Sequence, residues 1–178
     1  MNAGRINELV QKLDLLPHPE GGFYKETYRS DGIIPTSELS KEFSGPRNYC
    51  TAIYFLLTEG NFSAFHKINQ DEIWHFYEGD PLRVHMITSE GSYSFQDIGL
   101  NLDVGQIPQF TVLAGLWFAS EVAENGNYSL VGCTVSPGFD FDDFELPSRS
   151  KMIELFPEHE EIISRLTRLK PMLPLRIK

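Results

Sequence analysis

Residues 60–79, which read GNFSAFHKINQDEIWHFYEG, decide the fold of this chain. The stretch begins with a glycine, places His66 after five further residues and Glu72 after five more, and closes with a glycine. Apolar segments predicted to be strands flank it at 51–57 and 82–88. Glycine turns that bracket a histidine and a carboxylate between strands are typical of a β-barrel with a polar pair in its mouth. The stretch therefore predicts a barrel that holds a ligand.

The composition is that of a soluble globular protein. A chain of 178 residues is predicted as one domain, 1–178, and is long enough to bury a substantial core. The formal net charge of -10 argues against nucleic acid and membrane partners, because a phosphate-binding face needs clustered lysine and arginine. No segment approaches the roughly 20 apolar residues that span a membrane. Cys50 and Cys133 lie in apolar segments without zinc-like or disulfide-like spacing, so we expect buried thiols in a cytoplasmic protein.

The rest of the chain predicts an all-β protein with short helices at both termini. Residues 2–15 carry apolar side chains on one face of an amphipathic helix. From about 22 to 146, short strands recur about every ten residues with turn residues between them, which is typical of an antiparallel sandwich or barrel. Within this region, 30–48 is expected to be a long polar loop. At about 148–170 the pattern is again helical, and Ser148 can cap the first of these helices.

The central stretch resembles the first motif of the cupin superfamily. That motif consists of a glycine, five residues, His-x-His, three or four residues, a glutamate, six residues and a glycine. Every fixed element matches here except one, since Ile68 stands where the second histidine belongs. The second cupin motif ends in a metal-binding histidine, and residues 113–118 match its glycine while placing Phe118 at the histidine position.

A closer resemblance is to a little-characterised cupin family, cupin 5. It rests on the segments HPEGG at 18–22, DEIWHFYEGDPL at 71–82 and SPGFDF at 136–141. The resemblance implies a cupin jelly-roll barrel, homodimers and an enclosed pocket for a small-molecule ligand. It also implies kinship with the deoxysugar epimerases of rhamnose synthesis.

The residues present predict no tightly held metal cofactor. The resemblance implies a site of three histidines and one glutamate, whereas this chain offers only His66 and Glu72, which would be the ligands of any metal that binds. If 72–78 is extended, Trp74 shares a face with Glu72, and His75 points away from it. His75 is therefore not expected to replace a missing ligand.

The candidate catalytic residues are His66, Glu72 and Tyr77. Inside an apolar cavity, a neighbouring carboxylate favours a charged imidazole while desolvation opposes it, so His66 could act as a base near neutral pH. The resemblance to epimerases implies removal of a proton next to a sugar carbonyl, with a tyrosine on the far face of the substrate. Tyr54 and Tyr24 are alternatives to Tyr77. The competing interpretation is that His66 and Glu72 form a buried pair that satisfies itself and has no chemical role.

Further ligand-binding candidates are aromatic and charged side chains. Cavities combine aromatic walls with a few polar groups, and the arginine fork suits phosphate or carboxylate. These candidates are Trp74, Phe76, Phe118, Tyr54, Arg47, Arg29 and Glu20. Ion pairs would account for the two arginines equally well, and a solvated turn for Glu20. The acidic residues between 140 and 145 are expected to form a solvated loop with phenylalanine anchors rather than a calcium site.

Two classes of function therefore stay open. The first is a metal-independent sugar or nucleotide-sugar epimerase or isomerase with His66 as general base. The second is a non-catalytic protein that binds a small metabolite. The apolar residues at two metal-ligand positions argue against metal-dependent cupin chemistry, which needs several ligands around an open site.

Overall fold

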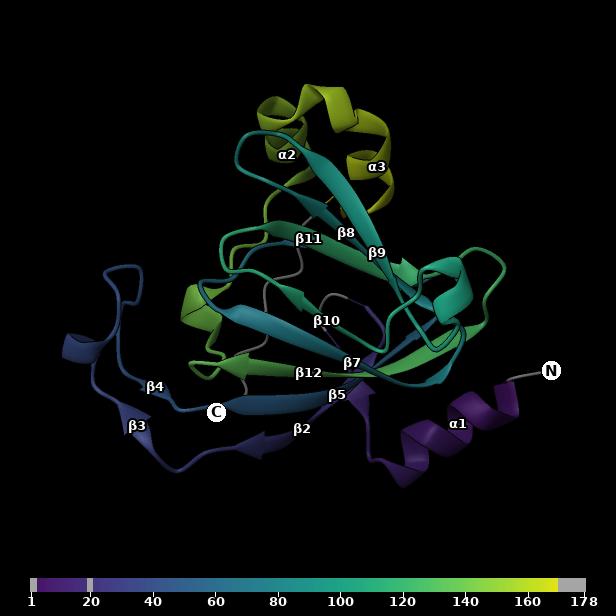
Figure 1. Ribbon diagram of the computed structural model, residues 1–178, viewed down its shortest axis with the longest axis horizontal. Helices are drawn as coiled ribbons and strands as arrows, with labels where there is room; N and C mark the ends of the chain where they lie inside the picture. The colour runs from purple at the N-terminus through teal and green to yellow at the C-terminus, as the bar shows by residue number, and fades with distance from the viewer. Residues whose placement is uncertain (1–2, 19–20, 170–178) are drawn as a thin grey trace.

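The computed structural model describes residues 3–18 and 21–169, whose strands form two main sheets (Figure 1). The sheets have the orders β1-β2-β5-β12-β7-β10 and β6-β11-β8-β9, with neighbouring strands antiparallel. The larger sheet contains β1 (Leu16–Pro17), β2 (Phe23–Arg29), β5 (Thr51–Thr58), β12 (Tyr128–Ser136), β7 (Asp71–Gly79) and β10 (Gln109–Val112). The smaller sheet contains β6 (Phe62–His66), β11 (Trp117–Val122), β8 (Leu82–Ile87) and β9 (Tyr93–Ile98). This double-sheet arrangement confirms the expected all-β jelly-roll fold.

The main apolar core lies between the two sheets. Successive side chains of a strand point to opposite faces, so alternate residues of β8 and β12 reach this core. From β8 these are Leu82, Val84 and Met86, and from β12 they are Val131, Cys133 and Val135. The alternation on two facing strands thus builds the walls between which a cavity can form.

Helices cover the outer faces of both sheets. In Figure 1, α2 (Arg149–Leu155) and α3 (Glu160–Arg165) lie above the smaller sheet, and the short helix η4 (Pro157–His159) joins them. Their contact with the sheet is a second apolar cluster: Phe65, Ile87, Trp117, Ala119, Met152, Phe156, Ile163 and Leu166. The expected cap is confirmed, because the Ser148 hydroxyl accepts a hydrogen bond from the backbone N–H of Lys151 at 3.3 Å. The helical region ends at Arg165, earlier than the sequence pattern indicates.

The N-terminal amphipathic helix is also confirmed, as α1 (Ala3–Lys12). Leu9 is buried, and Ile6, Val10 and Leu13 pack with it against the outer face of the larger sheet. The helix is shorter than expected, because Asp14 has a left-handed φ of 53°. Along the described chain, no helix combines the length and apolar character that crossing a bilayer would require.

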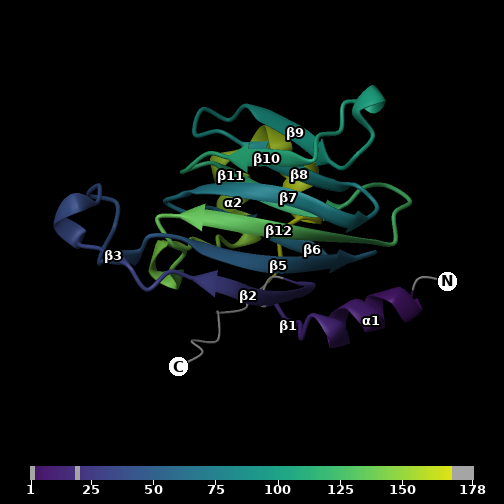
Figure 2. The same cartoon turned by 60° about the horizontal axis from the view of Figure 1, so that its bottom comes forward.

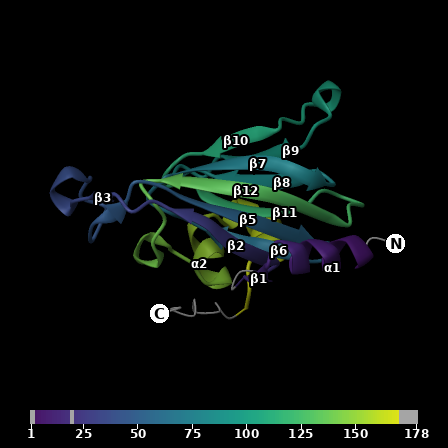
Figure 3. The ribbon, with the colours of Figure 1, turned by 90° about the horizontal axis from the view of Figure 1, so that it is seen from below.

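The segment expected to be a loop at 30–48 contains a small hairpin. Its strands are β3 (Ile33–Ile34) and β4 (Arg47–Asn48), and η1 (Thr36–Glu38) lies between them. Figures 2 and 3 show this hairpin projecting beyond the ends of the sheet strands. The remaining short helices are η2 (Leu102–Val104) and η3 (Phe141–Asp143). The hairpin brings Arg47 against the loop that contains η3, next to the cavity described below.

Candidate functional site

A cavity of about 860 Å³ opens between the two sheets. Its walls combine aromatic and aliphatic side chains with histidines, carboxylates and a few hydroxyl groups. The lining residues are Leu16, His18, Tyr24, Lys25, Glu26, Arg29, Thr51, Ile53, Phe55, Ser63, His66, Ile68, Glu72, Trp74, Cys133, Val135, Phe139, Asp140, Phe141, Asp142 and Phe144. A space of this volume accepts a metabolite of the size of a sugar or a larger one.

His66 lies at the end of β6, in the cavity wall, and is 6% exposed. Its Nδ1 atom lies 2.7 Å from the backbone carbonyl oxygen of Ala64. Because a carbonyl oxygen can only accept, Nδ1 carries the proton of this hydrogen bond, and the basic nitrogen of the neutral ring is Nε2. The rings of Phe118 and Phe144 lie 4.0 and 5.2 Å from the imidazole, centre to centre. The local structure therefore fixes both the tautomer and the surroundings of the histidine.

Glu72, on β7, is buried and lines the same cavity as His66. Trp74, two residues further along the strand, also lines the cavity. His75 lies on the opposite face, where Nε2 contacts Thr134 Oγ1 at 3.1 Å and Nδ1 accepts a bond from Gln109 Nε2 at 3.1 Å. The predicted alternation of β7 is confirmed.

The residues at the cupin metal positions do not fit a divalent ion. Ile68 and Phe118 are 2% and 1% exposed and belong to the apolar core. Phe118 pairs directly with His66 across β11 and β6, so its side chain occupies the position of a would-be ligand. In the described ranges, no group of three or more histidine, cysteine, aspartate or glutamate side chains is placed to hold a metal. With two apolar side chains among four ligand positions, a resident metal has too few donors.

The three tyrosines considered as the second partner are divided between two faces of the larger sheet. Tyr24 lines the cavity, where the His18 ring packs edge-on against it at 4.7 Å. Tyr77 is 50% exposed, is not part of the cavity wall and packs against the ring of Tyr54 at 5.9 Å. The expectation that Tyr77 faces His66 across the cavity is therefore wrong, and of the three tyrosines Tyr24 is the one that lines the same cavity as His66.

The aromatic candidates for ligand binding also differ in position. Trp74 is part of the cavity wall. Phe76 and Phe118 pack in the core behind the wall rather than lining it. Tyr54 packs with the cluster under α1, on the outer face. Glu20 falls outside the described residues.

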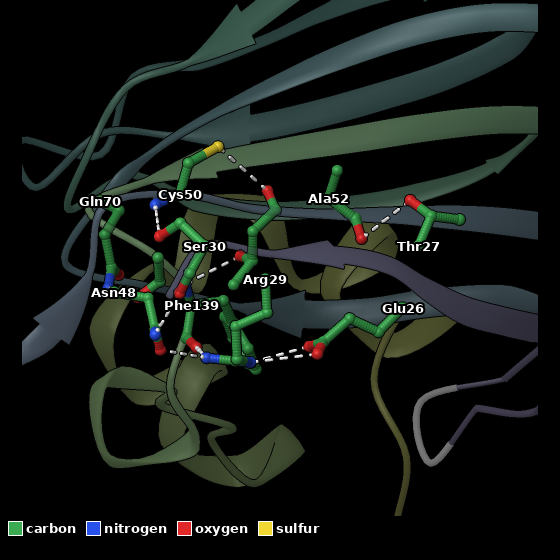
Figure 4. Close-up of polar contacts among 11 residues, drawn as sticks. Glu26, Thr27, Arg29, Ser30, Asn48, Cys50, Ala52, Gln70 and Phe139 are labelled. Carbon is green, nitrogen blue, oxygen red and sulfur yellow. Dashed lines mark hydrogen bonds and ion pairs between the residues drawn. The ribbon is translucent and has the colours of Figure 1, made fainter. Parts of the chain in front are cut away.

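Arg29 lines the cavity, but its guanidinium is held by acceptors of the protein (Figure 4). Nε and Nη2 donate to the two carboxylate oxygens of Glu26 at 3.0 and 2.7 Å. Nη1 donates to Asn48 Oδ1 at 2.9 Å and to the backbone oxygen of Phe139 at 3.2 Å. Arg29 thus joins β2, β4 and the loop after β12 at the rim of the cavity.

Arg47 does not reach the cavity and instead forms a buried ion pair with Asp143. Its Nε and Nη2 atoms donate to the two carboxylate oxygens at 2.7 and 2.6 Å, and the side chains are 4% and 1% exposed. Gln70 Nε2 donates to the same carboxylate at 2.6 Å. These hydrogen bonds to Asp143 raise the pKa of Arg47. The expectation that the whole acidic cluster is a solvated loop is therefore wrong for Asp143, which anchors the loop from inside.

The loop anchored in this way forms an aromatic wall that sequence reasoning missed. Phe139, Phe141 and Phe144 all line the cavity, and their ring centres lie 5.1 to 6.2 Å apart in edge-on pairs. The alternating phenylalanine and aspartate residues at 139–144 were the available signal, but only the fold shows which side faces the cavity. Cys133, also missed, lies in the wall on β12.

Comparisons with known proteins agree with this architecture. A family model described as "Cupin superfamily (DUF985)", Cupin_5, matches residues 7–147. A crystal structure of a protein from Shewanella oneidensis is 40% identical, with 92% of this chain and 98% of that chain covered at a TM-score of 0.83. An uncharacterised protein of Saccharomyces cerevisiae is 31% identical over 150 residues, which cover 78% of this chain and 73% of the yeast protein.

A more distant structure shows similarity of fold alone. A variant of oxalate decarboxylase from Bacillus subtilis is 17% identical, with 88% of this chain and 38% of that chain covered at a TM-score of 0.52. The match of the family model spans all the strands described above and includes the central histidine and glutamate. The chain belongs to the cupin 5 family of the cupin superfamily.

Proposed function

We propose that this cupin binds a small hydroxy-carbonyl metabolite of the sugar type in its cavity and isomerises or epimerises it without a resident metal. His66 is the general base. The single observation that carries the proposal is the hydrogen bond between His66 Nδ1 and the Ala64 carbonyl. It leaves Nε2 as the basic nitrogen of a buried ring in the cavity wall. A histidine held in one tautomer inside an apolar chamber is suited to proton transfer near neutral pH.

The proposed reaction removes one proton from the substrate and returns one proton to it. Nε2 of His66 takes a proton from the carbon next to the substrate carbonyl, and the electron pair of that C–H bond becomes part of an enediolate. Glu72, in the same cavity, stabilises the imidazolium that forms. Tyr24 lines the cavity and supplies a phenolic O–H that can return a proton to the other face of the carbon. The result is inversion at that carbon, or a shift of the carbonyl if the proton returns elsewhere.

A second candidate is a binding protein without chemistry. The observation that favours it is the apolar character of the positions held by Ile68 and Phe118, which leaves the cavity with few groups able to act on a ligand. In that case the same pocket would bind its ligand reversibly and return it unchanged.

One experiment separates the two candidates. A thermal-shift screen of sugars and small hydroxy-carbonyl compounds identifies ligands, and each hit is then incubated with the protein in D2O. We expect deuterium to enter the carbon next to the carbonyl, and His66→Asn to slow this exchange by about 100-fold or more while ligand binding persists. His75→Asn is the matched control, because His75 points away from the cavity on the outer face of β7 and its replacement should leave exchange unchanged.

The possible results have distinct meanings. Exchange that persists at the normal rate in His66→Asn refutes the assignment of the base. Ligands that bind the unaltered protein without any exchange favour the second candidate.

We also propose that the chain forms a homodimer, as membership of this family implies. Large apolar side chains exposed on and beside β2 and β3, namely Tyr28, Ile33 and Tyr49, support such an interface. Sedimentation equilibrium at micromolar concentration tests it, and a monomer mass would contradict it.

A further inference from the structure

The charges that line the cavity are unfavourable for an anionic ligand. Two cations, Lys25 and Arg29, are in the wall, together with four carboxylates: Glu26, Glu72, Asp140 and Asp142. With the histidines neutral, these described residues give the wall a net charge of −2. A cavity with this balance repels phosphate and attracts neutral or positively charged groups.

Both cations are already paired with carboxylates of the protein. Arg29 is bound bidentately by Glu26, and its remaining donors contact Asn48 and the backbone of Phe139. Lys25 Nζ lies 2.5 Å from Asp14 Oδ2. A phosphate would have to displace these partners before either cation could bind it, so of the two ligand classes expected from the sequence, sugar and nucleotide-sugar, the second lacks a free cation among the described residues of this wall.

The rest of the wall suits an uncharged or aminated ring. Three phenylalanines of the 139–144 loop line the cavity, with their rings edge-on to one another, and the face of such a ring can pack against a sugar or an ammonium group. Asp140 and Asp142 alternate with these rings in the same wall. Trp74 adds a further large aromatic side chain to this wall.

We infer that the ligand of this cavity is a free sugar or an amino sugar, and not a sugar phosphate or a nucleotide-linked sugar. The inference rests on the proposed function only in placing the ligand in the same cavity. It follows from the paired state of Lys25 and Arg29, the excess of carboxylates and the aromatic wall. The pocket would therefore differ from one that binds its substrate through a diphosphate group.

The test compares compounds that share a hexose ring and carry different charged groups: hexoses, 2-amino-2-deoxyhexoses and hexose 6-phosphates, with UDP-glucose as the nucleotide-linked member. Dissociation constants are measured by calorimetry and by ligand-observed NMR. We expect each phosphate to bind at least about tenfold more weakly than its parent sugar, and amino sugars to bind as well as or better than the parent. The variant Asp140→Lys/Asp142→Lys, which changes the wall from a net charge of −2 to +2, should reverse this order.

Phosphorylated or nucleotide-linked members that bind as tightly as their parent sugars would overturn the inference. So would failure of every hexose and amino sugar to bind, or an order of affinities that does not change in the charge-reversed variant. Isotope exchange remains a separate readout. Tight binding of neutral sugars without exchange would remove the catalytic proposal and leave this inference standing, while exchange on a preferred sugar phosphate would do the opposite.

Discussion

Removing Arg47 should destabilise the protein strongly through the carboxylate that it leaves behind. In Arg47→Met the Asp143 side chain, 1% exposed, keeps the weaker hydrogen bonds from Gln70 and Asn69 but loses its counter-charge. Breaking a buried pair by removing one partner costs about 3–5 kcal/mol, and the two remaining donors place the cost near the lower limit. A loss of about 3 kcal/mol lowers the melting temperature of a domain of this size by roughly 6–12 °C.

Urea unfolding followed by circular dichroism measures this change, and two further variants make it specific. Arg47→Met/Asp143→Leu removes both charges and should recover part of the lost stability, because an apolar pair has no desolvation cost, although the buried Gln70 amide loses its acceptor. Lys151→Met breaks an exposed pair with Glu154 and should change the free energy of unfolding by less than about 0.5 kcal/mol. A loss below about 1 kcal/mol in Arg47→Met, or a double variant no more stable than the single one, would refute the reasoning.

Three further outcomes are expected. Ile68→His/Phe118→His, which completes a set of three histidines and a glutamate, should retain a divalent ion through gel filtration, as measured by elemental analysis; a folded variant without metal would contradict the assigned positions. Hydrogen bonds, chiefly from Arg5, lower the pKa of Glu78 from 4.5 to about 2, so its contribution to stability is complete above about pH 5 and is lost as the pH falls toward 2. Because Glu78 is 35% exposed, Glu78→Gln should cost only about 1 kcal/mol at pH 7 and nothing at pH 2 in urea titrations. Ser148→Ala should cost about 1 kcal/mol by the same measurement, and Ser148→Asp should cost much less, since only the latter keeps an acceptor at the start of α2.

The features that sequence reasoning predicted correctly depend on neighbouring residues. Alternation along 71–79 places Glu72 and Trp74 in the cavity and His75 outside it. The same alternation sends Tyr77 to the outer face, so the pattern itself contained the signal against its assignment. A β-bulge at this point cannot be recognised from the sequence of β7 alone. Phe76 and Glu78 pair with consecutive residues of β12, and Tyr77 lies between them as the extra residue.

The features that it could not predict depend on distant pairing. Arg47 and Asp143 are separated by 96 positions, and no local pattern shows that one will neutralise the other. Arg29 is a mixed case: its bidentate partner Glu26 is only three positions away, whereas Asn48 and the backbone oxygen of Phe139, which occupy its remaining donor, are distant in the chain. Charged residues near a cavity can be assigned only when their partners in the folded chain are known.

The connection between β6 and β7 has a consequence for how such a protein can diversify. His66 ends a strand of the smaller sheet and Glu72 follows the start of a strand of the larger one, so residues 67–70 alone cross from layer to layer. Bringing two groups together through so short a link costs little chain entropy. The pair formed by the base and its carboxylate therefore depends on a short local segment, whereas the partner tyrosine and most of the other charged groups of the wall come from β2 and the loop after β12. The base and the selectivity of the chamber can accordingly change separately on this scaffold.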